Sequence, residues 1–137
     1  MAHDTVRVAE VRDWLDRARQ DLRAADLLLT SDEPLPDVAV FHCQQAAEKS
    51  LKAFLTWHDR PFRKTHNLEE LGEQCLGIDA GLEELIDRAV PLTEYAWRFR
   101  YPGEQEQVEP DEAEGARELA GEVYDAIAAR VPREARP

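Results

Sequence analysis

The chain has 137 residues, enough for a single domain built around one hydrophobic core. Its formal net charge of −12, from 29 acidic and 17 basic residues, excludes a general attraction to nucleic acid, so phosphate binding would need a local basic patch. A hydrophobic content of 43% and a charged content of 34% are typical of soluble globular proteins. With no signal peptide and no membrane-length apolar run, we expect a cytoplasmic protein with no membrane contact.

Scarce glycine and abundant alanine, leucine, glutamate and arginine favour helix over sheet. The first predicted helix spans residues 5–30, where apolar residues recur at spacings of three and four. Either Asp4 or Thr5 would cap its start. Two prolines within residues 31–36 end it before a second predicted helix at residues 37–58.

The second helix carries polar residues that are not scattered. On a helical wheel, one side gathers Gln45, Glu48, Lys49 and Lys52. This side is expected to face a cleft or solvent. Gln44 instead points into the apolar half, so we expect its amide to be buried and hydrogen-bonded, tying adjacent helices together.

Three alanines on the same helix, Ala39, Ala46 and Ala53, recur every seven residues. Such a seam of small side chains lets another helix approach closely. That neighbour could belong to the chain's own bundle or to a second chain. The spacing alone does not choose between the two.

The remaining predicted helices are a short one at residues 68–76, a fourth at 79–99 and a last at 111–131. Asn67 is the expected N-cap of the short helix, with Glu70 completing a capping box, and Gly77 ends it. Pro91 should kink or divide the fourth helix. Asp111 and Glu114 form a second capping box, and residues 132–137 are expected to fray.

These elements predict an all-α fold, an up-and-down antiparallel bundle of four long helices plus one short helix. The whole chain, residues 1–137, forms one domain with its core at about 5–131. Cys43 and Cys75 are expected to be buried, reduced thiols. No metal-ligand cluster, glycine-rich phosphate loop or nucleophilic triad is found, so neither a metal nor a cofactor is expected.

Four stretches of the sequence stand out in order: Trp14 with Ala18 and Asp21-Leu22; Phe41-His42 leading into residues 44–49 and 51–53; Thr65-His66-Asn67-Leu68; and Arg100-Tyr101-Pro102. Together they cover almost the whole chain. In their order and spacing they resemble the HEPN domain family, named for higher eukaryotes and prokaryotes nucleotide-binding.

The resemblance implies a helical bundle that commonly forms a symmetric homodimer and binds a nucleotide or RNA. Family members often pair with a separately encoded minimal nucleotidyltransferase, and several such pairs act as toxin and antitoxin. Many members are metal-independent ribonucleases that use an Arg and a His separated by four to six residues. Whether this chain is an enzyme depends on that last motif.

Arg60 and His66 have five residues between them, which meets the ribonuclease spacing. An imidazole can act as general acid or base, and a guanidinium can bind phosphate oxygens. In ribonuclease members, however, the motif lies later, where Arg98 and Arg100 stand here, and no His follows either at the required distance. His66 could also simply support the start of the short helix beside Asn67.

The resemblance suggests a nucleotide or RNA site on the polar side of the second helix. Lys49 and Lys52 would face phosphate there, with Gln45 and Glu48 beside them. Arg98, Arg100 and Tyr101 would join them to clamp a phosphate and stack a base. The plainer alternatives are a solvated face with ordinary salt bridges, or a purely structural dimer.

A second basic stretch precedes the short helix and contains His58, Arg60, Arg63 and Lys64. It is the most basic segment of an acidic chain and could meet an anionic ligand. It could equally neutralise the acidic loop at residues 104–114, within the chain or across a dimer.

Overall fold

The computed structural model describes residues 4–98, 102–103 and 107–137. All regular structure in these residues is helical, which confirms the predicted all-α class. Over the same residues, no helix combines the length and the apolar character that crossing a membrane requires. The elements, with η for a 3-10 helix, are α1 (Thr5–Thr30), α2 (Pro36–Trp57), α3 (Leu68–Leu76), η1 (Ala80–Leu82), α4 (Glu83–Ala89), η2 (Val90–Ala96), α5 (Pro110–Ala128) and η3 (Arg133–Ala135).

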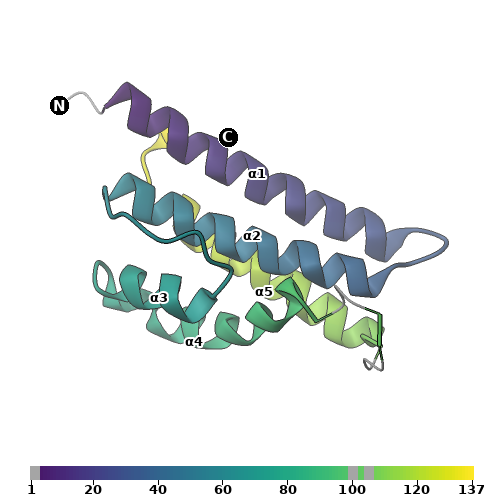
Figure 1. Ribbon diagram of the computed structural model, residues 1–137. Helices are drawn as coiled ribbons and strands as arrows, with labels where there is room; N and C mark the ends of the chain where they lie inside the picture. The colour runs from purple at the N-terminus through teal and green to yellow at the C-terminus, as the bar shows by residue number, and fades with distance from the viewer. Residues whose placement is uncertain (1–3, 99–101, 104–106) are drawn as a thin grey trace.

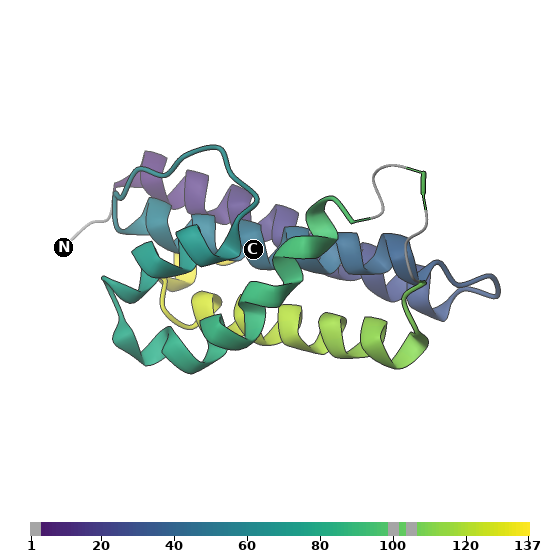
Figure 2. The same ribbon diagram turned by 60° about the horizontal axis from the view of Figure 1, so that its bottom comes forward.

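Helix α2 is the central element of the bundle (Figure 1). Helix α1 runs antiparallel along one side of it, α5 lies along another, and α3 and η2 pack on a third (Figures 1 and 2). Thirteen of its 22 residues are buried, far more than the single stripe of a surface helix. The up-and-down topology is completed by α4 and η2, which lead back to the start of α5.

The predicted fourth helix at residues 79–99 is divided into the three short elements η1, α4 and η2. Helix α4 ends at Ala89, and the chain tightens into η2 with Pro91 near its start. Proline has no N–H to donate, and its ring clashes with the carbonyl four residues earlier, so the α-helix cannot continue through it. The bundle therefore has three long helices, and α4 with η2 in series takes the place of the fourth.

The alanine seam is an intrachain contact. Ala39, Ala46 and Ala53 are all fully buried within this one chain. Helices α1 and α5 pack closely on α2, so the absence of larger side chains serves the bundle itself. The alternative, a second chain packed on this seam, does not fit the structure, because the seam is already covered.

The C-terminal tail is packed, which corrects the expectation that residues 132–137 fray. Val131 is buried and Ala135 has no exposed surface. The short helix η3 contacts α1, and the Arg12 side chain donates a hydrogen bond to the carbonyl of Glu134. Burial of Ala135 and the hydrogen bond from Arg12 thus hold residues 132–137 against α1.

The two N-caps expected for α1 and α3 are confirmed, but the capping box expected at Glu70 is wrong, because Glu70 pairs with Arg63 and the Asn67 N–H donates to Thr65 Oγ1. Asp4 accepts from the N–H groups of Val6 and Arg7, and Asn67 accepts from Glu69 and Glu70. Helix α5 differs, because it begins at Pro110 and has no side-chain cap. Proline fits there, since the first residues of a helix have no intrahelical partner for an N–H.

Cys43 and Cys75 are both free and buried, as expected. Burial disfavours the thiolate and raises the pKa of each thiol to about 12. The two residues act as small apolar side chains of the core.

Gly72 and Gly115 offer a matched test of the packing between α3 and α4. A Cβ at Gly72 would lie 2.5 Å from Cγ2 of buried Ile86, whereas one at Gly115 meets nothing within 4 Å. Gly72→Ala should destabilise the fold by about 1–3 kcal/mol through overpacking. Gly115→Ala should stabilise it by up to about 1 kcal/mol, since alanine favours helix.

Urea denaturation of both variants would measure these changes in the free energy of unfolding. A Gly72→Ala variant as stable as the Gly115→Ala variant would contradict the close approach of Ile86 to α3.

Candidate functional site

The segment between α2 and α3, residues 58–67, is here called the connector. Asp59 adopts a left-handed backbone conformation with φ of 56° directly after α2 and reverses the chain. The connector then runs back along α2 (Figure 1). It is held by α2 at both ends: the Arg60 N–H donates to the Leu55 carbonyl at 2.9 Å, and the Gln44 side chain donates to the His66 carbonyl at 3.0 Å.

These anchors keep Arg60 and His66 apart. Leu55 and Gln44, where the connector is anchored, are three turns apart, about 16 Å along the helix axis. Arg60 lies in an open hollow with Arg7, Glu10 and Asp59. The sequence spacing that suggested a catalytic pair is therefore not matched by proximity in space.

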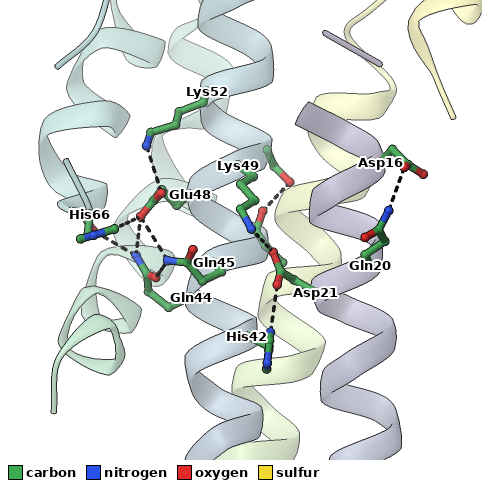
Figure 3. Close-up of polar contacts among 12 residues, drawn as sticks. Asp16, Gln20, Asp21, His42, Gln44, Gln45, Glu48, Lys49, Lys52 and His66 are labelled. Atoms are coloured by element: carbon green, nitrogen blue, oxygen red, sulfur yellow. Dashed lines mark hydrogen bonds and ion pairs between the residues drawn. The ribbon is translucent and has the colours of Figure 1, made fainter. Parts of the chain in front are cut away.

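Glu48 lies at the centre of the polar cluster that holds the connector (Figure 3). Its side chain is only 4% exposed. One carboxylate oxygen accepts from His66 Nδ1 at 2.7 Å, and the other accepts from Lys52 Nζ at 3.0 Å. The amide nitrogens of Gln44 and Gln45 also point at this carboxylate, at 3.2 and 3.4 Å. A buried carboxylate needs such compensation because removing it from water costs several kcal/mol.

Gln44 is fully buried and hydrogen-bonded, which confirms the expectation for this position. Its amide nitrogen reaches both Glu48 and the His66 carbonyl, and its oxygen accepts from Gln45 at 2.7 Å. The tie it makes is between α2 and the connector rather than between two helices.

Lys52 lies between two aromatic rings. Its ammonium is 5.5 Å from the ring centroid of Trp14 on α1 and 5.7 Å from that of Phe62 in the connector. Together with the ion pair to Glu48, these rings leave the Lys52 side chain 9% exposed. The polar side of α2 is therefore covered at Glu48 and Lys52, which corrects the expectation that it faces a cleft or solvent.

A second polar cluster joins α2 to α1 (Figure 3). Asp21 accepts from Lys49 Nζ at 2.7 Å and contacts His42 Nδ1 at 2.9 Å. Sequence reasoning did not assign Asp21 or His42 a role. The role of Asp21 could have been predicted from its position beside the apolar residue Leu22, because a carboxylate that is buried there needs a partner from another helix.

Arg98 forms ion pairs with an acid in the first turn of α5 and with an acid four residues earlier in the sequence. Its guanidinium lies 3.5 Å from Glu112 and 3.6 Å from Glu94. Trp97 beside it is half exposed. Arg100 and Tyr101, the other two candidates from this region, lie outside the described residues.

His66 is the accessible member of the Glu48 cluster, with a side chain that is 53% exposed. Because Nδ1 faces Glu48, the other ring nitrogen, Nε2, is the atom available to a ligand. An imidazole fixed in this way can offer Nε2 to a ligand as a hydrogen-bond donor or acceptor. No group of three or more His, Cys, Asp or Glu suited to a metal ion occurs in residues 4–98, 102–103 and 107–137.

A family model described as HEPN domain matches residues 11–131, from the second turn of α1 to beyond the end of α5. The chain belongs to the HEPN family. The resemblance recognised from the sequence is thereby confirmed over nearly the whole length of the chain. Neither the curated proteins nor the solved structures contain a significant match.

Within this HEPN domain, the Glu48 cluster joins three of the four sequence features that carry the resemblance. Trp14 comes from the first feature, Glu48 and Lys52 come from the second, and His66 comes from the third. Residues that are far apart in the sequence thus meet at one place, the junction of α1, α2 and the connector.

The Glu48–Lys52 pair should contribute far more to stability than an exposed ion pair of the same HEPN domain. Lys52→Ala leaves a buried carboxylate without its cation, which should cost about 3–5 kcal/mol. Arg63→Ala removes a bidentate pair with Glu70, but Arg63 is 80% exposed. Its loss should change stability little, because solvent screens an exposed ion pair. Equal losses in chemical denaturation would contradict the burial of Lys52.

Proposed function

We propose that this HEPN protein binds a nucleotide or RNA at the connector, with His66 as a contacting residue. The observation that carries the proposal is the geometry of His66, whose ring is half exposed while Nδ1 is fixed by buried Glu48. Fixing the ring before a ligand arrives reduces the conformational entropy lost on binding. An exposed histidine without such support would serve a ligand less well.

The charge of the connector supports the same site. In a chain of net charge −12, Arg60, Arg63 and Lys64 stand close together and Asp59 is the only acid nearby in the segment. Burial, reinforced by Arg60 and Arg7, lowers the pKa of His58, so that imidazole is neutral at pH 7. Arg63 already pairs with Glu70 and Arg60 lies apart from His66, so Lys64 is the connector cation best placed to attract a phosphate at this site.

The other candidate residues divide into two roles under this proposal. Glu48 and Lys52 position His66, because both are buried and bonded within the chain. Gln45 lies half-buried at the edge of the Glu48 cluster, where an arriving ligand could reach it, whereas Lys49 is also half-buried but is held by Asp21 on the α1 side of α2. Arg98, Arg100 and Tyr101 stay candidates for phosphate and base contacts.

His66→Ala should weaken nucleotide or RNA binding at least about fivefold, a loss of roughly 1 kcal/mol that is typical of one hydrogen bond. His42→Ala is the matched control, since His42 is also held by a carboxylate, Asp21, but on the α1 side of α2. Titration of labelled RNA and of nucleotide triphosphates against both variants would measure the change.

Equal weakening by His42→Ala would assign the effect to general destabilisation and contradict the proposal. Circular dichroism of each variant before titration checks that the fold is retained. Binding that is unchanged in His66→Ala would place the site elsewhere on the domain.

A second candidate function is metal-independent RNA cleavage with His66 as general acid or base. A specific contact favours it: the Leu68 N–H donates to Thr93 Oγ1 at 3.1 Å, so the start of α3 adjoins η2, which leads to Arg98 and Arg100. An arginine from that segment, rather than Arg60, would then serve the phosphate.

In a cleavage assay run in EDTA, His66→Ala should abolish cleavage, while Arg60→Ala should leave most of it. Loss of cleavage in Arg60→Ala alone would instead support the pair suggested by the sequence spacing. No cleavage by the wild type at any RNA tested would exclude this second function and leave the binding proposal standing.

Family membership supports three further parts of the proposal. They are a symmetric homodimer, a separately encoded minimal nucleotidyltransferase as partner, and action in the cytoplasm as one member of a toxin–antitoxin-like pair. The net charge of −12 fits a protein that acts on a specific partner, because this charge opposes nonspecific binding of the domain to nucleic acid.

A further inference from the structure

Exposed apolar side chains gather at one end of the bundle. Six large hydrophobic residues are exposed in the part of the chain that the structure describes, and only Val6 lies at the other end, in the first turn of α1. The five at the gathered end are Leu27, Leu35, Val38, Phe41 and Trp97. Large exposed apolar groups collected in one region mark interaction surfaces more often than scattered ones do.

Contacts between distant segments show that this is one end of the fold. Asp37 in the first turn of α2 accepts from the Val108 N–H at 3.2 Å, and Arg98 reaches Glu112 in the first turn of α5. The end of α1, the start of α2 and the start of α5 therefore meet here (Figure 2). We call this region the hairpin end.

Three of the apolar residues form a stripe at the start of α2. Val38 and Phe41 are three residues apart on α2, which places them on the same side of the helix, and Leu35 is the N-cap residue directly before its first turn. Their exposed fractions are 52%, 43% and 38%, so none is used by the core. The stripe leaves one side of an otherwise central helix without a partner.

The surroundings of the stripe are acidic. Residues 24–41 contain four acids and no Lys or Arg, and residues 107–116 likewise contain four acids and no Lys or Arg. Within the described part of the chain, Arg117 and Arg98 reach this end, and both pair with acids there: Arg117 with Asp26, and Arg98 with Glu112.

We propose that the hairpin end docks a partner protein whose own surface presents apolar side chains ringed by lysine and arginine. Apolar contact at Val38 and Phe41 would supply affinity, and the acids around them would select a basic partner and speed its association. RNA is disfavoured because its phosphates meet carboxylates. A second copy of the chain would bring the same negative charge to the contact.

The probe for this surface is a helical amphipathic peptide of leucine and lysine. Two matched peptides accompany it, one with glutamate in place of lysine and one with serine in place of leucine. In an NMR titration, the leucine–lysine peptide should shift the amide resonances of residues around 35–41. Neither control peptide should shift them. Val38→Ser combined with Phe41→Ser should weaken binding at least about tenfold.

Val6→Ser is the matched protein control, since it removes an exposed apolar side chain from the opposite end and should leave the affinity unchanged. Asp32→Asn with Glu33→Gln should weaken binding mainly at low salt. The proposal is overturned by shifts that map elsewhere, by equal weakening in Val6→Ser, or by equal binding of the glutamate peptide.

Light scattering and RNA titration test the other occupants. A wild-type dimer that dissociates in the Val38→Ser/Phe41→Ser variant would show that a second copy covers this end and overturn the proposal. So would RNA-induced shifts at residues 35–41. Nucleotide affinity of the same variant should equal that of the wild type, so a failure of the connector site remains distinguishable from a failure here.

Discussion

The interaction on which the rest of the structure depends is the buried carboxylate of Glu48. It lies on the central helix and accepts hydrogen bonds from that helix and from the connector. A charge in such a place is tolerated only when every lone pair finds a donor. The need for those donors fixes the position of Lys52, the path of the connector and the orientation of His66. One carboxylate thus links the stability of the core to the arrangement of the candidate site.

Local sequence determines much of this fold, and those parts could be predicted. The starts of α1 and α3 follow from their N-cap residues, Asp4 and Asn67. Gln44 was recognisable because a polar side chain at an apolar position has to find partners within the fold. The family resemblance added the overall arrangement. What these features share is that their physical cause lies within a few residues of their effect.

The remaining features depend on contacts between distant segments. The periodicity of the sequence does not show that the connector turns back at Asp59 and covers α2. The sequence therefore predicts that Lys52 is exposed, whereas the structure places it between Trp14 and Phe62. The tail at Ala135 is fixed by α1, more than a hundred residues earlier. Arg60 and His66 show the converse, because a short spacing in sequence becomes a wide separation when the chain between them is extended.

The bond from Gln44 to residue 66 has a consequence for how this surface can change over time. It reaches the backbone carbonyl, a group that every amino acid provides. The connector therefore keeps its hydrogen bond to Gln44 whatever side chain stands at position 66. The side chain at this position can therefore be replaced while the backbone keeps this attachment to the central helix.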